Sequence, residues 1–334
     1  MSGTVVVTGA TGFIGGHLCA RLTRDGWRVR AIVRTSGASL RDAEAFEIPD
    51  LAAPTSAPRL AEALDGADAL IHLAGRAHVL RDSAAEPLAA FRTANVEATR
   101  AVVGAAVAAR TPVIALMSSA AVVGDPPPQR VDADTAPRPT TPYGASKLKA
   151  EHIAREATDG TRTVLRIFRP PLVYGPRMVG NPKRLFRLVD SGMPLPFGCI
   201  RNQRSFVYVG TLIDAFVASL RPGLPPTPPL FPSDAEALST PAFARAIARA
   251  LGRGGPIVPV PLSLLRAAGR VGDALARLGP FPLRSVEVDR LVGSFVIDGG
   301  ATRALLGAPV PVPLDEALAT TAAWWRSRRA DAGP

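Results

Sequence analysis

Two side chains that can exchange a proton stand four residues apart in the segment YGASK, namely Tyr143 and Lys147. At this spacing on a helix they share a face, and the preceding Thr141-Pro142 pair is typical of a helix start. A phenol has a pKa near 10, and an ammonium about 4 Å away contributes roughly 4 kcal/mol at an effective dielectric constant near 20. That energy corresponds to about three pKa units. The pair therefore predicts a tyrosine that works as an acid–base group near neutral pH.

A hydroxyl donor for the same reaction is Ser119, in the segment MSSAA at 117–121. It follows a predicted strand over 113–117, and ligands of parallel sheets bind at the carboxyl ends of strands. A hydrogen bond from Ser119 would polarise a substrate oxygen while Tyr143 exchanges its proton and a hydride leaves or joins the carbon that carries this oxygen. The three side chains predict the interconversion of an alcohol and a ketone.

A glycine-rich turn, TGATGFIG at 8–15, follows the first predicted strand and opens a helix. Its three glycines have the spacing G-x-x-G-x-x-G. Glycines let the backbone turn sharply and approach a pyrophosphate closely, and the helix N-terminus offers free N–H groups. We expect a dinucleotide to be held here by Gly9, Thr11, Gly12, Phe13, Ile14 and Gly15.

The choice between NAD and NADP depends on the end of the second strand, where an acidic residue would bond the adenosine ribose. The sequence has VRTS at 33–36 instead, with Arg34 at the decisive place. Because a guanidinium suits a 2′-phosphate, the sequence favours NADP(H), and NAD stays the alternative. Asp50 and Leu51, after the expected third strand, are candidates for contact with the adenine.

These groups need a parallel sheet to bring them together. Short β-branched runs alternate with helix-length segments through the first half, which predicts an α/β fold with a doubly wound parallel (Rossmann) sheet. The expected strands are 4–7, 29–33, 69–73, 113–117 and 164–168, and the expected helices include 15–25, 58–64 and 91–109. We expect residues 1–169 to form the cofactor-binding domain with the catalytic residues.

Proline becomes dense after about residue 170, and short helices are expected over 185–191, 212–220 and 241–251. We predict that residues 170–334 form a smaller, loop-rich part that binds substrate, with some segments returning to the Rossmann domain.

Composition bears on partners and compartment. The net charge is +11, but 36 of the 39 basic residues are arginines and no segment interleaves aromatic and basic residues, so we expect no nucleic acid partner. No apolar run is long enough to span a membrane and no signal peptide is evident, so we expect no membrane partner. The two cysteines form neither a disulfide framework nor a metal-binding spacing. Together these features predict a cytoplasmic protein without a metal.

The sequence resembles the extended short-chain dehydrogenases/reductases of the NAD-dependent epimerase/dehydratase family over nearly its whole length. The resemblance rests on TGATGFIG (8–15), HLAG (72–75), NVEAT (95–99), the Ser119, Tyr143 and Lys147 set, RPPLVYGP (169–176) and RSFVYV (204–209). It implies that these three residues are catalytic and that the cofactor is lined by Leu73, Ala74, Gly75, Asn95, Tyr143, Lys147 and Pro170. It also implies that Ser119, Asn181, Arg204 and Arg290 contact a nucleotide-diphosphate sugar, and that the chain is a homodimer.

Departures from the family pattern narrow the reaction. Dehydratases of the family carry an Asp-Glu pair where this chain has Ala120-Ala121, so we reject water elimination. A 4-epimerase with NAD and a 4-keto-sugar reductase with NADPH, in a surface-polysaccharide pathway, remain equally open. The alternatives from other classes are a reductase of a small non-nucleotide ketone and a non-catalytic NADPH-binding accessory subunit.

Three further residues invite a functional interpretation, but we expect them to be structural. His72 lies at the end of a predicted strand, and Asp214 is expected to cap or pair. Trp325, near the C-terminus, is expected to anchor the last helix through its apolar surface.

Overall fold

The structure is a computed structural model. It describes residues 3–35, 40, 43–77, 87–124, 130–276 and 284–331. Ser36 lies outside the described residues, and so does His78, a second histidine that the sequence offers as an acid–base candidate.

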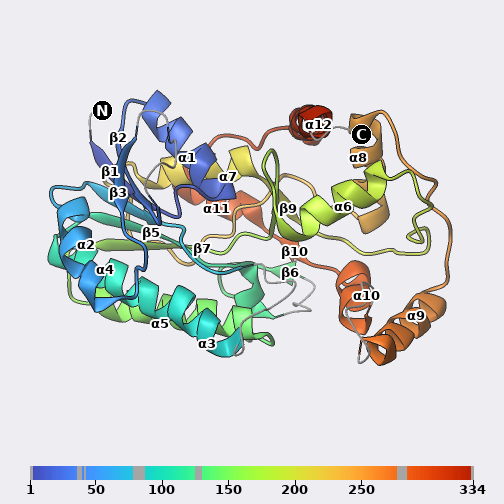
Figure 1. Cartoon of the computed structure of the whole chain (residues 1–334), viewed down its shortest axis with the longest axis horizontal. Coiled ribbons are helices and arrows are strands. Elements are labelled where there is room, and N and C mark those ends of the chain that lie inside the picture. Colours follow the sequence, from blue (N-terminus) through green and yellow to red (C-terminus); the bar gives the residue numbers. More distant parts are fainter. Residues whose placement is uncertain are drawn as a thin grey trace.

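A six-stranded, wholly parallel sheet forms the N-terminal half of the molecule (Figure 1). Val6 in the first strand pairs with Arg30 on one side and Leu70 on the other. The strand order is β3-β2-β1-β4-β5-β7, so it reverses between β1 and β4, which is where ligands bind in such sheets. The strands are β1 (Thr4–Thr8), β2 (Arg28–Val33), β3 (Glu44–Glu47), β4 (Ala69–His72), β5 (Val113–Met117) and β7 (Val164–Phe168).

Helices cover both faces of the sheet because successive side chains of a strand point to opposite faces. Val5 and Val7 lie in one buried cluster and Val6 in another. The first cluster includes side chains of α1 (Phe13–Arg24), α7 (Val209–Ser219) and α11 (Gly299–Leu306), and the second those of α2 (Ala57–Leu64), α4 (Ala98–Ala108) and α5 (Pro142–Thr158). The doubly wound α/β architecture expected from the sequence is confirmed.

The helix expected over 91–109 is not continuous, which corrects that prediction. Short α3 (Pro87–Phe91) leads into a π-helical turn, η2 (Arg92–Glu97), before α4 begins. A π-turn inserts one residue into the helix and changes the direction of the side chains in it. Asn95 lies in this turn and is buried.

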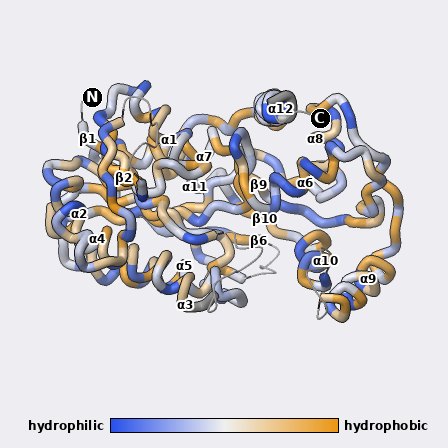
Figure 2. The backbone as a smooth tube through the Cα atoms, in the orientation of Figure 1, coloured by the Kyte–Doolittle hydropathy of each residue, from blue (hydrophilic) through white to orange (hydrophobic). Residues whose placement is uncertain are grey.

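The C-terminal half has its own core, with Phe186, Phe206, Phe243, Leu318 and Trp325 among its buried members. This half comprises α6 (Gly180–Asp190), α8 (Thr240–Leu251), α9 (Leu262–Leu275), α10 (Ser285–Val292) and α12 (Leu314–Asp331). It also carries two small parallel sheets, β8 (Leu172–Tyr174) with β9 (Phe206–Tyr208) and β6 (Arg130–Val131) with β10 (Val296–Ile297). Figure 2 shows apolar stretches in the strands of the first half and in several segments of the C-terminal half, α9 among them.

Helix α6 begins five residues before the expected start at 185, because Pro182 is tolerated in the first turn of a helix. Asn181 therefore stands on a helix rather than in a loop. Helices α7 and α11 follow residue 170 in the sequence but pack on the sheet of the first half. The division between residues 169 and 170 therefore does not separate two packing units, and it stays a prediction.

Candidate active site

Ser119 and Tyr143 meet at the carboxyl end of β5. Ser119 begins the 3-10 turn η3 (Ala120–Val123), and its Oγ accepts the N–H of Ala121 at 3.2 Å. Tyr143 stands in the first turn of α5, where the Oγ1 of Thr141 accepts the N–H of Gly144 at 3.1 Å. A hydrogen bond from Ser119 to the Tyr143 hydroxyl joins the two side chains. The local sequence thus fixes both hydroxyls toward a common point.

Lys147 lies one helical turn beyond Tyr143 and is 6% exposed. Its Nζ donates to the carbonyl of Met117 at 2.8 Å, which ties α5 to β5. Burial lowers the pKa of Lys147 to about 8, and the charge of Glu151 opposes that shift. The amine also lies against Gly75, since a Cβ on that glycine would come within 3.1 Å of Nζ.

The acidity expected for Tyr143 is corrected by the structure. Burial raises the pKa of Tyr143 above its usual value, and the hydrogen bond from Ser119 only partly opposes this. The charge of Lys147, whose buried amine is directed to the Met117 carbonyl, does not outweigh this effect of burial. The expectation from spacing alone was wrong because it counted the charge of the lysine and omitted the desolvation of both groups.

A buried ionic network lies directly behind Lys147. The carboxylate of Glu151, which is 1% exposed, accepts from Nε and Nη2 of Arg169 at 2.9 and 2.6 Å. The hydroxyl of Ser118 donates to the same carboxylate. Arg169 is 3% exposed and stacks over Phe231 at 5.6 Å. The network joins α5 to the residues that follow β5 and β7.

Sequence reasoning missed this network. Glu151 follows Lys147 by four residues, and a carboxylate on the buried face of the catalytic helix was the one available indication. Its partners cannot be predicted from sequence spacing. Ser118 and Arg169 follow two different strands, β5 and β7, and they reach Glu151 only once these strands pair in the sheet. The same packing places Pro170 beside the catalytic residues, where its carbonyl accepts the N–H of Ala120 at 3.0 Å.

The glycine turn forms a close passage between β1 and α1. Gly9 has a φ of +67°, which favours glycine. A Cβ on Gly15 would lie 2.1 Å from the carbonyl oxygen of Gly9, so any side chain there would collide with backbone. Helix α1 begins after Gly12 without a side-chain cap, which leaves its first N–H groups free for an anion. Thr11 lies in this turn, Phe13 and Ile14 begin α1, and contact of these three residues with a cofactor stays a prediction.

The end of β4 faces this turn. The carbonyl of Thr8 accepts the N–H of Leu73 at 3.3 Å, and its Oγ1 accepts the N–H of Ala74 at 3.1 Å. Asn95 presents its Oδ1 to Gly75, where a Cβ would come within 2.8 Å, and donates to the Oγ of Ser146 at 2.9 Å. The structure therefore brings these predicted cofactor-lining residues together with Lys147 along one edge. A dinucleotide fits this edge, because Gly9, Gly12 and Gly15 have no side chains that would keep a pyrophosphate away from the backbone.

His72 is structural, as expected. It is 1% exposed, and its ring nitrogens contact the hydroxyls of Thr8 and Thr99 at 2.6 and 3.1 Å. Burial, aided by the charge of Lys147, lowers the pKa of His72 to about 3, so the ring is neutral. Asp214 pairs with Arg21. Trp325 packs on Phe186 and donates to Asp190 at 3.1 Å, which anchors α12.

The residues expected around the adenosine lie at the rim of the sheet. Arg34 and Asp50 are exposed, and Leu51 is half-buried. The Oδ1 of Asp50 accepts the N–H of Ala52 at 2.9 Å, so this carboxylate already stabilises a local turn. Contact of these three residues with the cofactor stays a prediction.

On the substrate side, the structure brings Arg204 and Arg290 together. The guanidinium of Arg204 donates to the carbonyl of Arg290 and, at 3.3 Å, to that of Gly293. Asn181 is exposed in the first turn of α6, which starts after Val179 without a side-chain cap. Contact of Asn181, Arg204 and Arg290 with one substrate stays a prediction.

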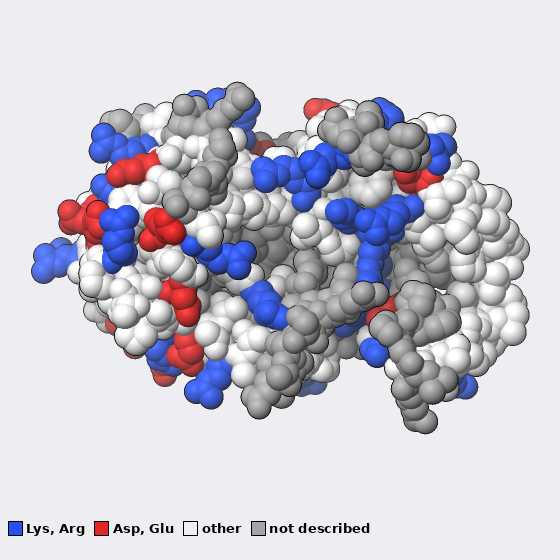
Figure 3. Space-filling model, viewed as in Figure 1, with Lys and Arg blue, Asp and Glu red and all other residues white. Residues whose placement is uncertain are grey.

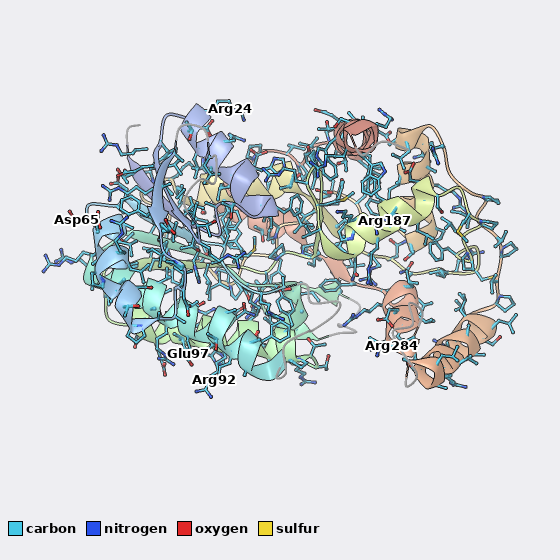
Figure 4. All side chains as sticks on the ribbon, in the orientation of Figure 1. Arg24, Asp65, Arg92, Glu97, Arg187 and Arg284 are labelled. Carbon is cyan, nitrogen blue, oxygen red and sulfur yellow. The ribbon has the colours of Figure 1, made fainter. Side chains whose placement is uncertain are left out.

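Charge is distributed unevenly over the molecule. Figure 3 shows a hollow between the two halves, with Lys and Arg gathered beside it and on the C-terminal half. Arg187 on α6 and Arg284 at the start of α10 belong to this half (Figure 4). In the sequence, residues 170–334 carry 19 of the 39 basic but only 11 of the 28 acidic residues. A positively charged border suits an anionic substrate.

Comparison with known proteins supports one family. Residues 5–227 match the model of the "NAD dependent epimerase/dehydratase family". A UDP-glucose 4-epimerase of Vibrio cholerae is 32% identical over 329 residues, which cover 96% of this chain and 95% of that protein. An N-acetyl-alpha-D-glucosaminyl-diphospho-ditrans,octacis-undecaprenol 4-epimerase of Escherichia coli O157:H7 is 28% identical over 216 residues, covering 64% of this chain and 62% of that protein.

Solved structures agree in fold. MoeE5 in complex with UDP-glucuronic acid and NAD has a TM-score of 0.75 at 25% identity, covering 98% of this chain and all of that one. The UDP-glucose 4-epimerase of Thermotoga maritima, with UDP-glucose, has a TM-score of 0.76 at 19% identity, covering 98% of this chain and 99% of that one.

Proposed function

Since the chain belongs to the NAD dependent epimerase/dehydratase family, as an NAD-dependent enzyme of the extended short-chain dehydrogenase type, we propose that it is a 4-epimerase of nucleotide-diphosphate hexoses. The observation that carries the proposal is the hydrogen bond between the Ser119 and Tyr143 hydroxyls, beside buried Lys147 and opposite the glycine turn. These groups suit reversible oxidation of a secondary alcohol. Relatives named as 4-epimerases favour C4 of a sugar as the reacting carbon.

The roles of the side chains follow from their positions. Tyr143 removes the proton from the C4 hydroxyl and returns it later, and Ser119 donates a hydrogen bond to the same oxygen. When bound, the oxidised cofactor supplies a hydride acceptor and a positive charge. That added charge is needed because burial raises the pKa of Tyr143 in the chain by itself. Lys147 ties α5 to β5 through its bond to Met117, and its amine borders Gly75 after β4.

We propose NAD as the cofactor, although the sequence favoured NADP(H). The comparisons give the NADP preference no support, since the cofactor in MoeE5 is NAD. In this chain Arg34 is exposed at the rim, where it is free to point away from the cofactor. A 4-keto-sugar reductase with NADPH remains the alternative that the experiment below separates.

We propose that Arg204 and Arg290, with Asn181 and the open N-terminus of α6, hold the diphosphate of the substrate. Guanidinium groups and free helix N–H groups are the usual ligands of phosphate. The relative from Escherichia coli acts, by its name, on a lipid-linked diphosphate sugar, which supports a place in surface-polysaccharide assembly. A cytoplasmic homodimer remains our expectation and is checked by light scattering and cell fractionation.

Mass spectrometry of the cofactor that co-purifies with the protein tests this proposal, together with an assay on UDP-hexoses without added cofactor. We expect stoichiometric NAD and interconversion of 4-epimers. Protein that is free of cofactor and consumes NADPH with a 4-keto nucleotide sugar would identify a reductase instead. Turnover of small ketones but not of nucleotide sugars would overturn the substrate assignment.

A further inference from the structure

Helices α9 and α10 form a hairpin at the end of the molecule remote from the sheet (Figure 1). The helices touch closely, since a Cβ on Gly269 would lie 3.0 Å from the Cα of Ser285. Ser285 also donates to Asp273 at 2.5 Å. Leu265 and Val288 are the buried side chains that join the hairpin to the second core. Most other side chains of α9 are exposed.

This exposed surface of α9 carries large apolar side chains from its first turn to its last, together with exposed Ser263, Arg266 and Arg270. Leu264, Val271 and Leu275 are 60%, 58% and 40% exposed, and spacings of seven and four place them on one helix face. Exposed Ala267, Ala268 and Ala274 fill the same face. Figure 2 shows apolar stretches along α9. A soluble surface rarely gathers large apolar side chains without a binding role.

Two guanidinium groups border this face. A groove of about 340 Å³ between the helices is lined by Arg266, Arg270, Ser285, Val288 and Asp289. Among the residues that the structure describes, neither arginine of the groove has a hydrogen bond or an ion pair. Asp289 is the one acidic residue in the lining, so the groove has an excess of positive charge. It also lies on the more basic half of the chain.

We propose that this hairpin docks the protein on the surface of an anionic phospholipid membrane. The face formed by Leu264, Val271 and Leu275 would enter the boundary between headgroups and acyl chains, and Arg266 and Arg270 would meet the lipid phosphates. An apolar helix face bordered by arginines is the combination that binds in the plane of such a surface. The proposal goes beyond the proposed reaction and does not depend on it.

Neither a spanning helix nor a second copy explains the face as well. Within the described part of the chain, no helix combines the length and apolarity needed to cross a bilayer. A stable protein interface buries about 800 Å² on each partner, which exceeds what three large side chains of one helix can supply. The positive charges of the arginines beside the apolar face would repel their equivalents in a symmetric dimer. Peripheral contact of this kind differs from the expectation that the chain has no membrane partner, and that expectation stays a prediction.

Co-sedimentation of the full-length protein with vesicles tests the proposal. The vesicles contain phosphatidylcholine alone or phosphatidylcholine mixed with phosphatidylglycerol. We expect binding to the mixed vesicles, weakened at least about tenfold by Arg266→Glu/Arg270→Glu, since each basic residue near the surface contributes about a fivefold change in affinity. Leu264→Ser/Val271→Ser should weaken binding similarly. Val310→Ser, at a 79% exposed valine outside the hairpin, is the matched control and should bind as the wild type does.

Three results would overturn membrane docking. One is no binding of the wild type to anionic vesicles, and another is binding that both double variants retain, which would reflect net charge alone. The third is a change of particle mass by light scattering in the Leu264→Ser/Val271→Ser variant, which would make the face an interface between copies. Melting temperature and turnover on soluble substrate should not change in any of these variants, so a failure of folding or of the proposed reaction is recognised separately.

Discussion

Replacement of Glu151 by glutamine should change the pH dependence of turnover as well as the stability. Glu151 lies four residues after Lys147 on α5, and such neighbours have Cβ atoms about 5–6 Å apart. Two unit charges about 6 Å apart interact by roughly 2.8 kcal/mol at an effective dielectric constant of 20. This equals about two pKa units. The pKa of Lys147, which burial places at about 8, should therefore fall further below its usual value in Glu151→Gln.

The sign of the effect on turnover follows from the charge of the lysine. Above the pKa of Lys147 the amine is neutral and no longer stabilises the phenolate of Tyr143. We expect the alkaline limb of the pH profile of kcat to move to lower pH by one to two units in Glu151→Gln, with bound NAD retained. Turnover measured from pH 5 to 10 checks this. Glu156→Gln, an exposed glutamate on the same helix, is the matched control.

A double-mutant cycle with Arg169→Met separates positioning from packing. Breaking a buried ion pair from one side costs about 3–5 kcal/mol, whereas removal of both charges costs much less. Stability should therefore be lost in each single variant and largely recovered in Glu151→Gln/Arg169→Met. The alkaline limb should instead follow Glu151 alone and stay shifted in the double variant. An unshifted limb in both Glu151 variants would refute the electrostatic reasoning and leave the network a purely structural feature.

Three further outcomes are expected. Gly15→Ala places a Cβ 2.1 Å from the Gly9 oxygen, so it should lower the free energy of unfolding by about 1–3 kcal/mol and abolish NAD binding. In the same unfolding assay, the control Gly104→Ala, whose Cβ meets nothing within 4 Å, should raise the free energy of unfolding by up to about 1 kcal/mol. Burial raises the pKa of Asp234 to about 6, so the native state binds this proton more tightly than the unfolded chain does. The unfolding free energy of the wild type relative to Asp234→Asn should therefore rise as the pH falls from 7 to 4, and urea unfolding that shows the opposite slope would contradict the sign. Arg204→Gln should raise the KM for a UDP-hexose at least about tenfold, since a hydrogen bond to a charged group contributes about 1.5–3 kcal/mol. Steady-state kinetics check it against exposed Arg201→Gln, and equal KM values would remove Arg204 from the substrate site.

The sequence predicted what depends on local pattern. Buried β-branched runs and glycine spacing located the sheet and the cradle at Gly9, Gly12 and Gly15, because both are set by periodicity and backbone freedom. The i, i+4 spacing placed Tyr143 and Lys147 on one helix, and the strand ending at Met117 placed Ser119 near them.

What the sequence could not supply depends on contacts between distant segments. The sign of the Tyr143 shift depends on burial and on the acceptor that Lys147 finds at Met117, thirty residues away. The partner of Glu151 is Arg169, which no periodicity connects to it. The interruption of the helix near Asn95 was also missed, because a π-turn leaves the apolar pattern almost unchanged.

Turnover of Tyr143→Phe with its cofactor content measured in parallel tests the central claim most directly. The account predicts that the variant keeps stoichiometric NAD while kcat on a UDP-hexose falls by about 10²–10⁴, the usual contribution of a general acid–base group. Tyr208→Phe, whose hydroxyl bonds Thr320 outside the catalytic group, should turn over normally. A Tyr143→Phe protein with full NAD and undiminished kcat would contradict the assignment.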